Sequence, residues 1–594
     1  MTYVAPLDEM RFVLDHLAGL PEIATLPGYE EAQPDVVEAI LTEAGRFAGE
    51  VLAPLNATGD RQGCRWEDGR VTTPDGFPQA YRQFVDAGWH AMPASPDIGG
   101  QGMPAVLSSA VAEMWKSANL AFSLSQMLTI GAVEALAHHA SDKLKARFLP
   151  KMVAGEWTGT MNLTEPQAGS DLSGVRTRAE PDGENYRLFG SKIFITWGEH
   201  DVAENIIHLV LARLPDAPVG TRGISLFVAP KFLVAADGSL GARNDLFCVS
   251  IEHKLGIHAS PTAIMSYGDK EGAIAYLIGE PNRGLEYMFT MMNHARLNVG
   301  LEGVAVAEAA YQKAVAYART RVQGKPIGGS ERASIIHHPD VRRMLMDMKA
   351  HTEAMRALAY VTAACMDRAR HHPDSGERRR NQGRVEFLTP VVKGWSTETS
   401  ILVASTGIQV HGGMGYVEET GAAQYFRDAR ITTIYEGTTG IQALDLIGRK
   451  LVRDKGVNAV ALIGDMKAEA AALASTNDPD LAAIGSALKT GLKSFQDATE
   501  WLLANHDRHP RETAAGATPY LKLTGVVACG WQMARAARIA RDLTQAGATD
   551  DAFLRGKIAT SRFYAEHVLP EAEAWRLEVT SGAASTLALA DASF

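Results

Sequence analysis

The sequence predicts a mostly helical α+β protein in which a β region lies between helical regions. Two observations indicate this order. Long segments carry apolar residues at helix spacing, and a central stretch carries short β-branched and aromatic runs separated by turn residues. The composition agrees with a folded chain, because 46% of the 594 residues are hydrophobic and 21% are charged. Disordered, collagen-like and low-complexity chains are therefore excluded.

The first helical region precedes the central stretch. Apolar residues recur at helix spacing between Val36 and Ala44, and further helical patterns follow. This predicts an N-terminal α domain over residues 34–156, preceded by a short extension over residues 1–33.

The central region, residues 157–282, is predicted to form an antiparallel β domain. Asp-Gly and Pro-Asp turn signals separate its short runs, whose lengths are typical of strands. The expected strands are Tyr186–Thr196, Asn205–Ala212, Gly223–Ala229, Leu246–Glu252 and Thr262–Tyr267.

Long helical patterns return after the central region and predict a C-terminal four-helix bundle over residues 283–454. The Ala-rich residues 457–594 predict an added helical domain. Between two helices, His371–Arg384 has four arginines and few apolar residues, so we expect a solvated loop there. The expected long segments are Leu285–Val322, Pro339–Arg370, Val385–Val410 and Thr438–Val452.

Several functional classes are disfavoured. The formal net charge of −11 opposes binding to nucleic acid. The N-terminus lacks a basic flank, and no uncharged apolar run is long enough for a membrane span, so we expect neither a secretory signal nor a membrane segment. No metal site is expected, because the His pairs are adjacent in sequence and would diverge on a helix. The four cysteines, which form no Cys-x-x-Cys pair, indicate reduced thiols in the cytoplasm: Cys64, Cys248, Cys365 and Cys529.

Three segments carry candidate chemistry. The turn within Met161–Asp171 could bind a polar ligand group, and Lys192–Thr196 could place an aromatic ring and a hydroxyl against a flat cofactor. Taken separately, the first segment is better explained as an ordinary loop, and the second as an ordinary alternating strand. In Arg430–Thr439, Glu436 precedes a glycine and a helix. Two interpretations of Glu436 are equally good: it is a general base with a raised pKa, or it is a carboxylate that stabilises the N-terminus of the helix.

Read together, the motifs resemble the acyl-CoA dehydrogenase family. The matching strings, in order, are TEPQAGSD, KIFIT, RVQGKPI, IQVHGGMGY and RDARITTIYEGTTGIQ. The chain is similar to a bacterial subgroup with an added C-terminal helical domain. The resemblance implies FAD as cofactor and oxidation of an acyl-CoA thioester to its 2,3-enoyl-CoA. Candidate substrates are 3-(methylthio)propanoyl-CoA and straight-chain and aromatic acyl-CoAs.

The resemblance also assigns residues. Glu436 corresponds to the catalytic base. Thr164 and Thr196 correspond to hydrogen-bond partners of the flavin ring, and Phe194 to the aromatic residue against it. The remaining positions are Ser170, Asn293 and Arg296 toward acyl-CoA, Thr438 toward the adenosine diphosphate of FAD, and Arg321, Gln409 and Gly413 toward the FAD of a neighbouring subunit.

Two departures concern the FAD tail: Gly324 directly follows Gln323, where relatives often have Phe, and Gly440 replaces a frequent polar residue.

A shared FAD site implies a homodimer, and the family implies an electron-transfer flavoprotein as electron acceptor. Two alternatives share the fold: an acyl-CoA oxidase and a DNA-associated alkylation-response flavoprotein. The latter requires a basic C-terminal domain, whereas residues 457–594 hold 13 basic and 16 acidic residues.

Overall fold

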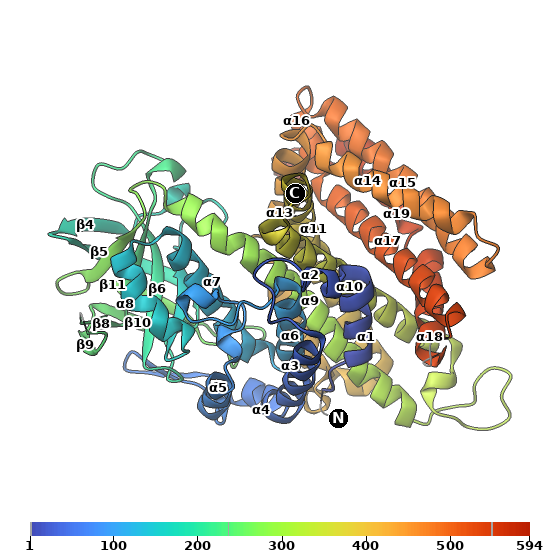
Figure 1. Ribbon diagram of the computed structural model, residues 1–594, viewed down its shortest axis with the longest axis horizontal. Helices are drawn as coiled ribbons and strands as arrows, with labels where there is room; N and C mark the ends of the chain where they lie inside the picture. The colour runs from blue at the N-terminus through green and yellow to red at the C-terminus, as the bar shows by residue number, and fades with distance from the viewer. Residues whose placement is uncertain (1–2, 236, 548–550) are drawn as a thin grey trace.

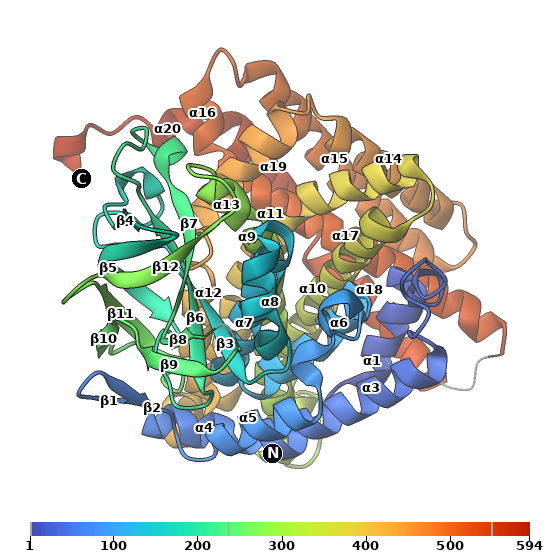
Figure 2. The same ribbon diagram turned by 60° about the vertical axis from the view of Figure 1, so that its left-hand side comes forward.

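The structure is a computed structural model that describes residues 3–235, 237–547 and 551–594, and all of their side chains except those of Met291, Asn293 and Asp551. It confirms the mostly helical α+β class, with helices on both sides of a sheet region in the sequence. Figures 1 and 2 place the sheet at one side of the molecule and the added helices at the other, with the longest helices between them.

The N-terminal segment and the first helical region pack together. The extension forms α1 (Leu7–Phe12), a π-helical turn (Val13–Ala18) and α2 (Leu20–Ile23), and the turn contacts helices of the bundle and of the added domain. The following helices are α3 (Pro34–Phe47), α4 (Ala53–Gln62), α5 (Phe77–Asp86), α6 (Ala105–Ala118), α7 (Leu120–His139) and α8 (Asp142–Val153), with a small hairpin of β1 (Arg65–Glu67) and β2 (Arg70–Thr72).

Helix α7 is long and apolar enough to cross a membrane, with a mean hydropathy of 1.4 over its best window. However, 83% of that window is buried inside the protein. Its residues pack against α9 and β3, so α7 is a core helix of this fold.

The central sheet contains the five strands expected from the sequence, within a few residues at their ends, and three more. Its order is β10-β11-β5-β12-β7-β6-β3, with β4 pairing with β5. One feature corrects the prediction of an antiparallel domain: β3 and β6 are parallel, whereas every other strand pair of the described sheets is antiparallel. The strands are β3 (Trp157–Asn162), β4 (Arg178–Asp182), β5 (Asn185–Thr196), β6 (Asn205–Ala212), β7 (Ser225–Pro230), β10 (Leu246–Ile251), β11 (Thr262–Tyr267) and β12 (Ala273–Ile278), beside a hairpin of β8 (Phe232–Val234) and β9 (Leu240–Arg243).

The bundle is built on three helices of more than 30 residues: α9 (Gly284–Thr320), α10 (Pro339–His371) and α11 (Ser375–His411). The short α12 (Ala422–Thr432) packs against α9 and α11, and α13 (Thr439–Asp445) continues into a π-helical segment, Leu446–Val452.

The expected loop over His371–Arg384 is wrong, because α11 already begins at Ser375. The side chain of Asp374 accepts hydrogen bonds from the N–H groups of Gly376 and Glu377, which caps the helix. Arginine is a good helix former, and Arg380 and Arg384 both pair with Asp465 of the added domain. The arginine-rich segment therefore forms a helical contact instead of a loop.

The added domain consists of helices that lie against the far side of the bundle (Figure 1). An apolar core runs continuously from the N-terminal extension through the bundle into this domain, and the sheet has a smaller core of its own. The helices are α14 (Val457–Ala474), α15 (Pro479–Asn505), α16 (Pro510–Ala515), α17 (Ala517–Gln545), α18 (Asp551–His567), α19 (Glu571–Ser581) and α20 (Ala583–Thr586).

Candidate active site

The predicted base, Glu436, lies in a tight turn between α12 and α13. Its φ of +54° is left-handed, as is the φ of +92° at Gly437. A Cβ atom at position 437 would lie 2.7 Å from Nε2 of Gln442, so the turn requires glycine there. A left-handed glutamate is strained, and such strain is typical of functional sites.

The environment of Glu436 affects its ionisation. Burial raises the pKa of its carboxyl above the ordinary value of 4.5, and the charge of Glu302 raises it further. The positive charges of Arg296 and Lys393 oppose both effects. A carboxylate with a raised pKa is a stronger proton acceptor, which suits a general base.

Arg296 lies on α9 beside the base and is only 5% exposed. Its Nη1 atom is 3.2 Å from Oδ2 of Asp445, and no described residue accepts a hydrogen bond from its Nε. A buried donor without a protein partner is available to a ligand. The side chain of Asn293, the other predicted residue in this segment, lies outside the described residues.

The aromatic residue predicted to face a flavin, Phe194, is placed by an irregularity in β5. The register between β5 and β11 shifts between the pairs Ala263–Ile195 and Met265–Lys192, which is a β-bulge. Phe194 has a φ of +59° and is 58% exposed. The bulge turns this large apolar side chain away from the strand's regular alternation and leaves its ring open to a ligand.

The TEPQAGSD loop is fixed against this bulge. Lys192 Nζ donates hydrogen bonds to Oε1 of Glu165 at 2.8 Å and to the carbonyl of Leu163 at 2.9 Å, and both charged side chains are buried. The N–H of Ile193 donates to the carbonyl of Thr164 at 2.9 Å. These contacts hold Thr164 close to the bulge that carries Phe194.

The other predicted residues near these motifs are also described. The carbonyl of Thr196 accepts a hydrogen bond of 2.7 Å from Oγ1 of Thr160, and the Thr196 side chain is half-buried. Ser170 belongs to the TEPQAGSD loop and is exposed. The hydroxyl of Thr438 caps α13 by accepting from the N–H of Ile441 at 3.3 Å.

Arg321, Gln409 and Gly413 form a second group, and all three are exposed. The end of α9 meets the end of α11, where the rings of Tyr317 and His411 stack with centroids 4.4 Å apart. Along α9, a rise of 1.5 Å per residue separates Arg296 from Arg321 by about 37 Å. The structure therefore does not bring this second group to Glu436 within one chain.

Sequence reasoning missed three charged residues behind the base: Lys116, Glu302 and Lys393. All three are buried. Lys116 Nζ is 3.5 Å from Oε1 of Glu302, and Lys393 Nζ donates to the carbonyl of Gly437 at 2.7 Å. The available signal was a single charged residue among uncharged, mostly apolar or small helical residues, as in MWKSA, GLEGVA and PVVKGW.

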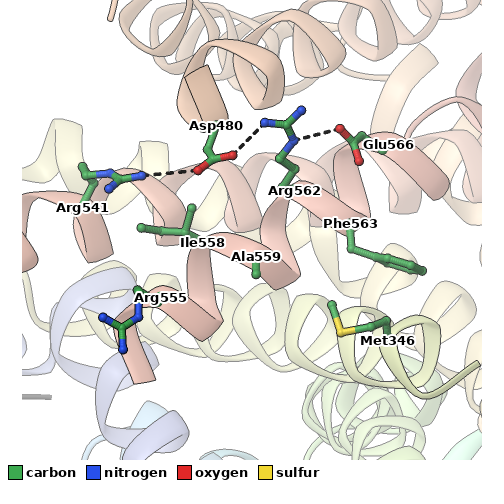
Figure 3. A pocket seen from close by; sticks show the side chains of 9 residues that line it. All are labelled: Met346, Asp480, Arg541, Arg555, Ile558, Ala559, Arg562, Phe563 and Glu566. Atoms are coloured by element: carbon green, nitrogen blue, oxygen red, sulfur yellow. Dashed lines mark hydrogen bonds and ion pairs between the residues drawn. The ribbon is translucent and has the colours of Figure 1, made fainter. Parts of the chain in front are cut away.

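A separate cleft of about 470 Å³ lies where α15, α17 and α18 of the added domain meet α10 of the bundle. Figure 3 shows Asp480 among the residues that line it, paired with Arg541 and Arg562. None of the predicted site residues lines this cleft, so it is distinct from the site around Glu436.

Family comparison divides nearly the whole chain among four known domains. The acyl-CoA dehydrogenase N-terminal domain matches residues 35–156, the middle domain residues 160–267 and the C-terminal domain residues 282–452. A domain described as acetyl-CoA dehydrogenase C-terminal like matches residues 462–590. These domains and the observed fold define an oxidoreductase that acts on CH–CH bonds. The chain belongs to the acyl-CoA dehydrogenase family, whose cofactor is FAD.

Individual relatives agree with this assignment. The chain is 48% identical over 590 residues to 3-methylmercaptopropionyl-CoA dehydrogenase of Ruegeria pomeroyi, with 99% of each chain covered. It is 35% identical to a butyryl-CoA dehydrogenase of Syntrophomonas wolfei, covering 96% of this chain and 95% of that one. A Bacillus anthracis acyl-CoA dehydrogenase solved with FAD has a TM-score of 0.74 at 20% identity, covering 96% and 91% of the two chains, and shows the same fold.

Proposed function

We propose that Glu436 is the general base of an FAD-dependent α,β-dehydrogenation of an acyl-CoA thioester. The observation that carries this proposal is the strained turn that holds a carboxyl with a raised pKa beside Arg296. The carboxylate removes the proton from the carbon next to the thioester carbonyl. When bound, FAD supplies the acceptor for the hydride that leaves the adjacent carbon.

The turn can also stabilise the developing enolate. No hydrogen bond among the described residues uses the N–H of Glu436. A free backbone donor beside the base can bind the thioester oxygen as its negative charge grows, in the manner of an oxyanion hole. Burial of the turn makes such a hydrogen bond stronger than it is in water.

The residues that would hold FAD fall into two groups. Thr164, Thr196 and Phe194 would contact the ring system, because the exposed Phe194 ring and the half-buried threonines meet at the bulge of β5. Thr438, together with the exposed Arg321, Gln409 and Gly413, would contact the remainder of FAD, the latter three from a second copy of the chain. Ser170, Asn293 and Arg296 would contact the acyl-CoA.

We expect 3-(methylthio)propanoyl-CoA to be the preferred substrate, which the 48% identity to a dehydrogenase of that thioester supports. The test is anaerobic mixing of the FAD-loaded enzyme with 3-(methylthio)propanoyl-CoA, butyryl-CoA and an aromatic acyl-CoA. Flavin absorbance should bleach fastest with the first of these. Faster bleaching by butyryl-CoA would reassign the substrate, and no bleaching by any of the three would refute the dehydrogenase activity.

The same reduced enzyme tests the electron acceptor. We propose an electron-transfer flavoprotein, so admission of air should reoxidise the flavin slowly and addition of that protein should reoxidise it quickly. Fast reoxidation by air alone would favour an acyl-CoA oxidase.

A cytoplasmic location is supported by the four cysteines, each of which is unpaired in the structure.

We propose a homodimer that completes each FAD site. Apolar side chains are exposed near Arg321 and Gln409, including Tyr416 at 88% and Ile327 at 91%. Exposed apolar side chains next to a binding group are typical of an interface. Tyr416→Asp should therefore shift the protein toward monomer in light scattering and lower its FAD content.

The matched control for this variant is Val219→Asp, which changes an equally exposed apolar residue on the β domain. It should leave both the mass and the FAD content unchanged. A Tyr416→Asp protein with wild-type mass and FAD content would contradict the proposed interface.

A further inference from the structure

Three buried side chains from three helices hold the turn that carries Glu436. The hydroxyl of Tyr435 donates to Glu302 of α9, and Nε2 of Gln442 of α13 donates to the carbonyl of Glu436 at 3.1 Å. Lys393 of α11 donates to the carbonyl of Gly437 at 2.7 Å. Each of the three residues of the turn is thus fixed by one contact.

Lys393 differs from the other cations in this region. It is fully buried, yet none of the described ion pairs includes it. Lys116 is neutralised by Glu302, and Arg296 by Asp445. A buried ammonium without a carboxylate partner is costly, so its presence requires another explanation than ion pairing.

Among the neighbouring charges, that of Glu436 has the largest effect on the pKa of Lys393. Burial lowers the pKa of Lys393 to about 8, and the charge of Glu436 is the largest opposing influence. In return, Lys393 lowers the pKa of Glu436. The charged groups around the turn are Lys116 of α6, Arg296 and Glu302 of α9, Lys393 and Glu398 of α11, and Asp445 and Arg449 beyond the base.

We propose that Lys393 is a positioning residue for the reaction: its ammonium group fixes the left-handed turn through Gly437 and keeps the carboxyl of Glu436 ionised. This inference rests on the proposed role of Glu436 as the base. Lys393 itself touches the carbonyl of Gly437, and it acts on the reaction through the turn and its charge.

The first test replaces Lys393 with methionine, which keeps the volume but removes both the charge and the hydrogen bond. The rate of anaerobic flavin bleaching by 3-(methylthio)propanoyl-CoA is measured against pH in the FAD-loaded protein. Loss of the cation should move the acid limb of this profile upward by about one pH unit, which lowers the rate about tenfold on the acid side. Lys393→Arg retains the charge and should restore most of the wild-type profile.

A second variant, which should shift the pH profile in the opposite direction, distinguishes an electrostatic effect from general structural damage. Glu302 raises the pKa of Glu436, so Glu302→Gln should move the acid limb downward. Because this variant alters the same buried cluster, a merely structural disturbance would move both profiles in one direction. If Lys393→Met fails to fold, Lys393→Arg and Glu302→Gln decide the question.

A readout without turnover is infrared difference spectroscopy between two pH values. The band of the protonated Glu436 carboxyl is the one that is absent in Glu436→Gln. It should persist to higher pH in Lys393→Met than in the wild type. An unchanged midpoint of this band and of the acid limb in a folded, FAD-loaded Lys393→Met protein would overturn the inference. Bleaching that survives in Glu436→Gln would instead refute the base assignment, so the two failures are distinguishable.

Discussion

Glu436→Gln is expected to bind FAD but to lose flavin bleaching by acyl-CoA, with a rate decrease of about 10⁴-fold, the upper range for a general base. The amide has nearly the same shape as the carboxyl but cannot accept the α-proton. Burial raises the pKa of Glu436, so ionisation of this carboxyl costs the folded protein stability at pH values above the ordinary carboxyl pKa. The variant should therefore be at least as stable to heat as the wild type.

The control for this prediction is Glu500→Gln, which makes the same chemical change at an exposed position on α15. It should bleach at the wild-type rate. The decisive comparison is the anaerobic stopped-flow trace of the two variants at equal FAD content. Comparable rates in both would assign proton removal to another residue, and a Glu436→Gln protein that no longer binds FAD would assign Glu436 to cofactor binding.

The sequence predicted the local features of this site well, because they depend on neighbouring residues. Short β-branched and aromatic runs between turn residues located β5 and β6, helix spacing located α9 to α11, and the motif strings selected Glu436 and Phe194. Such runs do not specify the partner of a strand, and the parallel pairing of β3 with β6 was accordingly missed. The β-bulge at Phe194 depends on its register with β11, which is also a property of two distant segments.

The residues that support the base were harder to predict, since each comes from a different part of the chain. Lys116, Glu302 and Lys393 lie in α6, α9 and α11, and only the packing of these helices brings them behind the turn. Their common signal is a charge that interrupts an apolar helical run. That signal indicates a buried charge, but it does not identify which other charge lies beside it.

A second buried charge network joins the two ends of the chain. Lys557 of α18 donates to Oε1 of Glu9 at 2.7 Å and to Oε2 of Glu353 at 2.8 Å, and all three side chains are buried. Glu9 belongs to the N-terminal extension and Glu353 to α10 of the bundle. One ammonium group thus connects the extension, the bundle and the added domain, so the extension and the added domain are expected to stabilise each other.

Lys557→Met should lower the free energy of unfolding by about 3–5 kcal/mol, because removal of one partner leaves buried carboxylates uncompensated. Glu353 keeps Lys349 as a second partner, whereas Glu9 has no other partner in a described ion pair. The damage should therefore centre on Glu9, and adding Glu9→Gln to Lys557→Met should recover part of the loss.

Urea unfolding measures the effect, with Lys493→Met as the matched control. Lys493 pairs with Asp497 at 2.8 Å, but its side chain is 75% exposed, so its removal should cost less than about 1 kcal/mol. Equal losses in the two lysine variants would show that Lys557 does not join the three regions. Because Lys557 contacts all three regions, we also expect limited proteolysis to remove the N-terminal extension of the Lys557→Met protein first, since Glu9 then has no charged partner in the added domain.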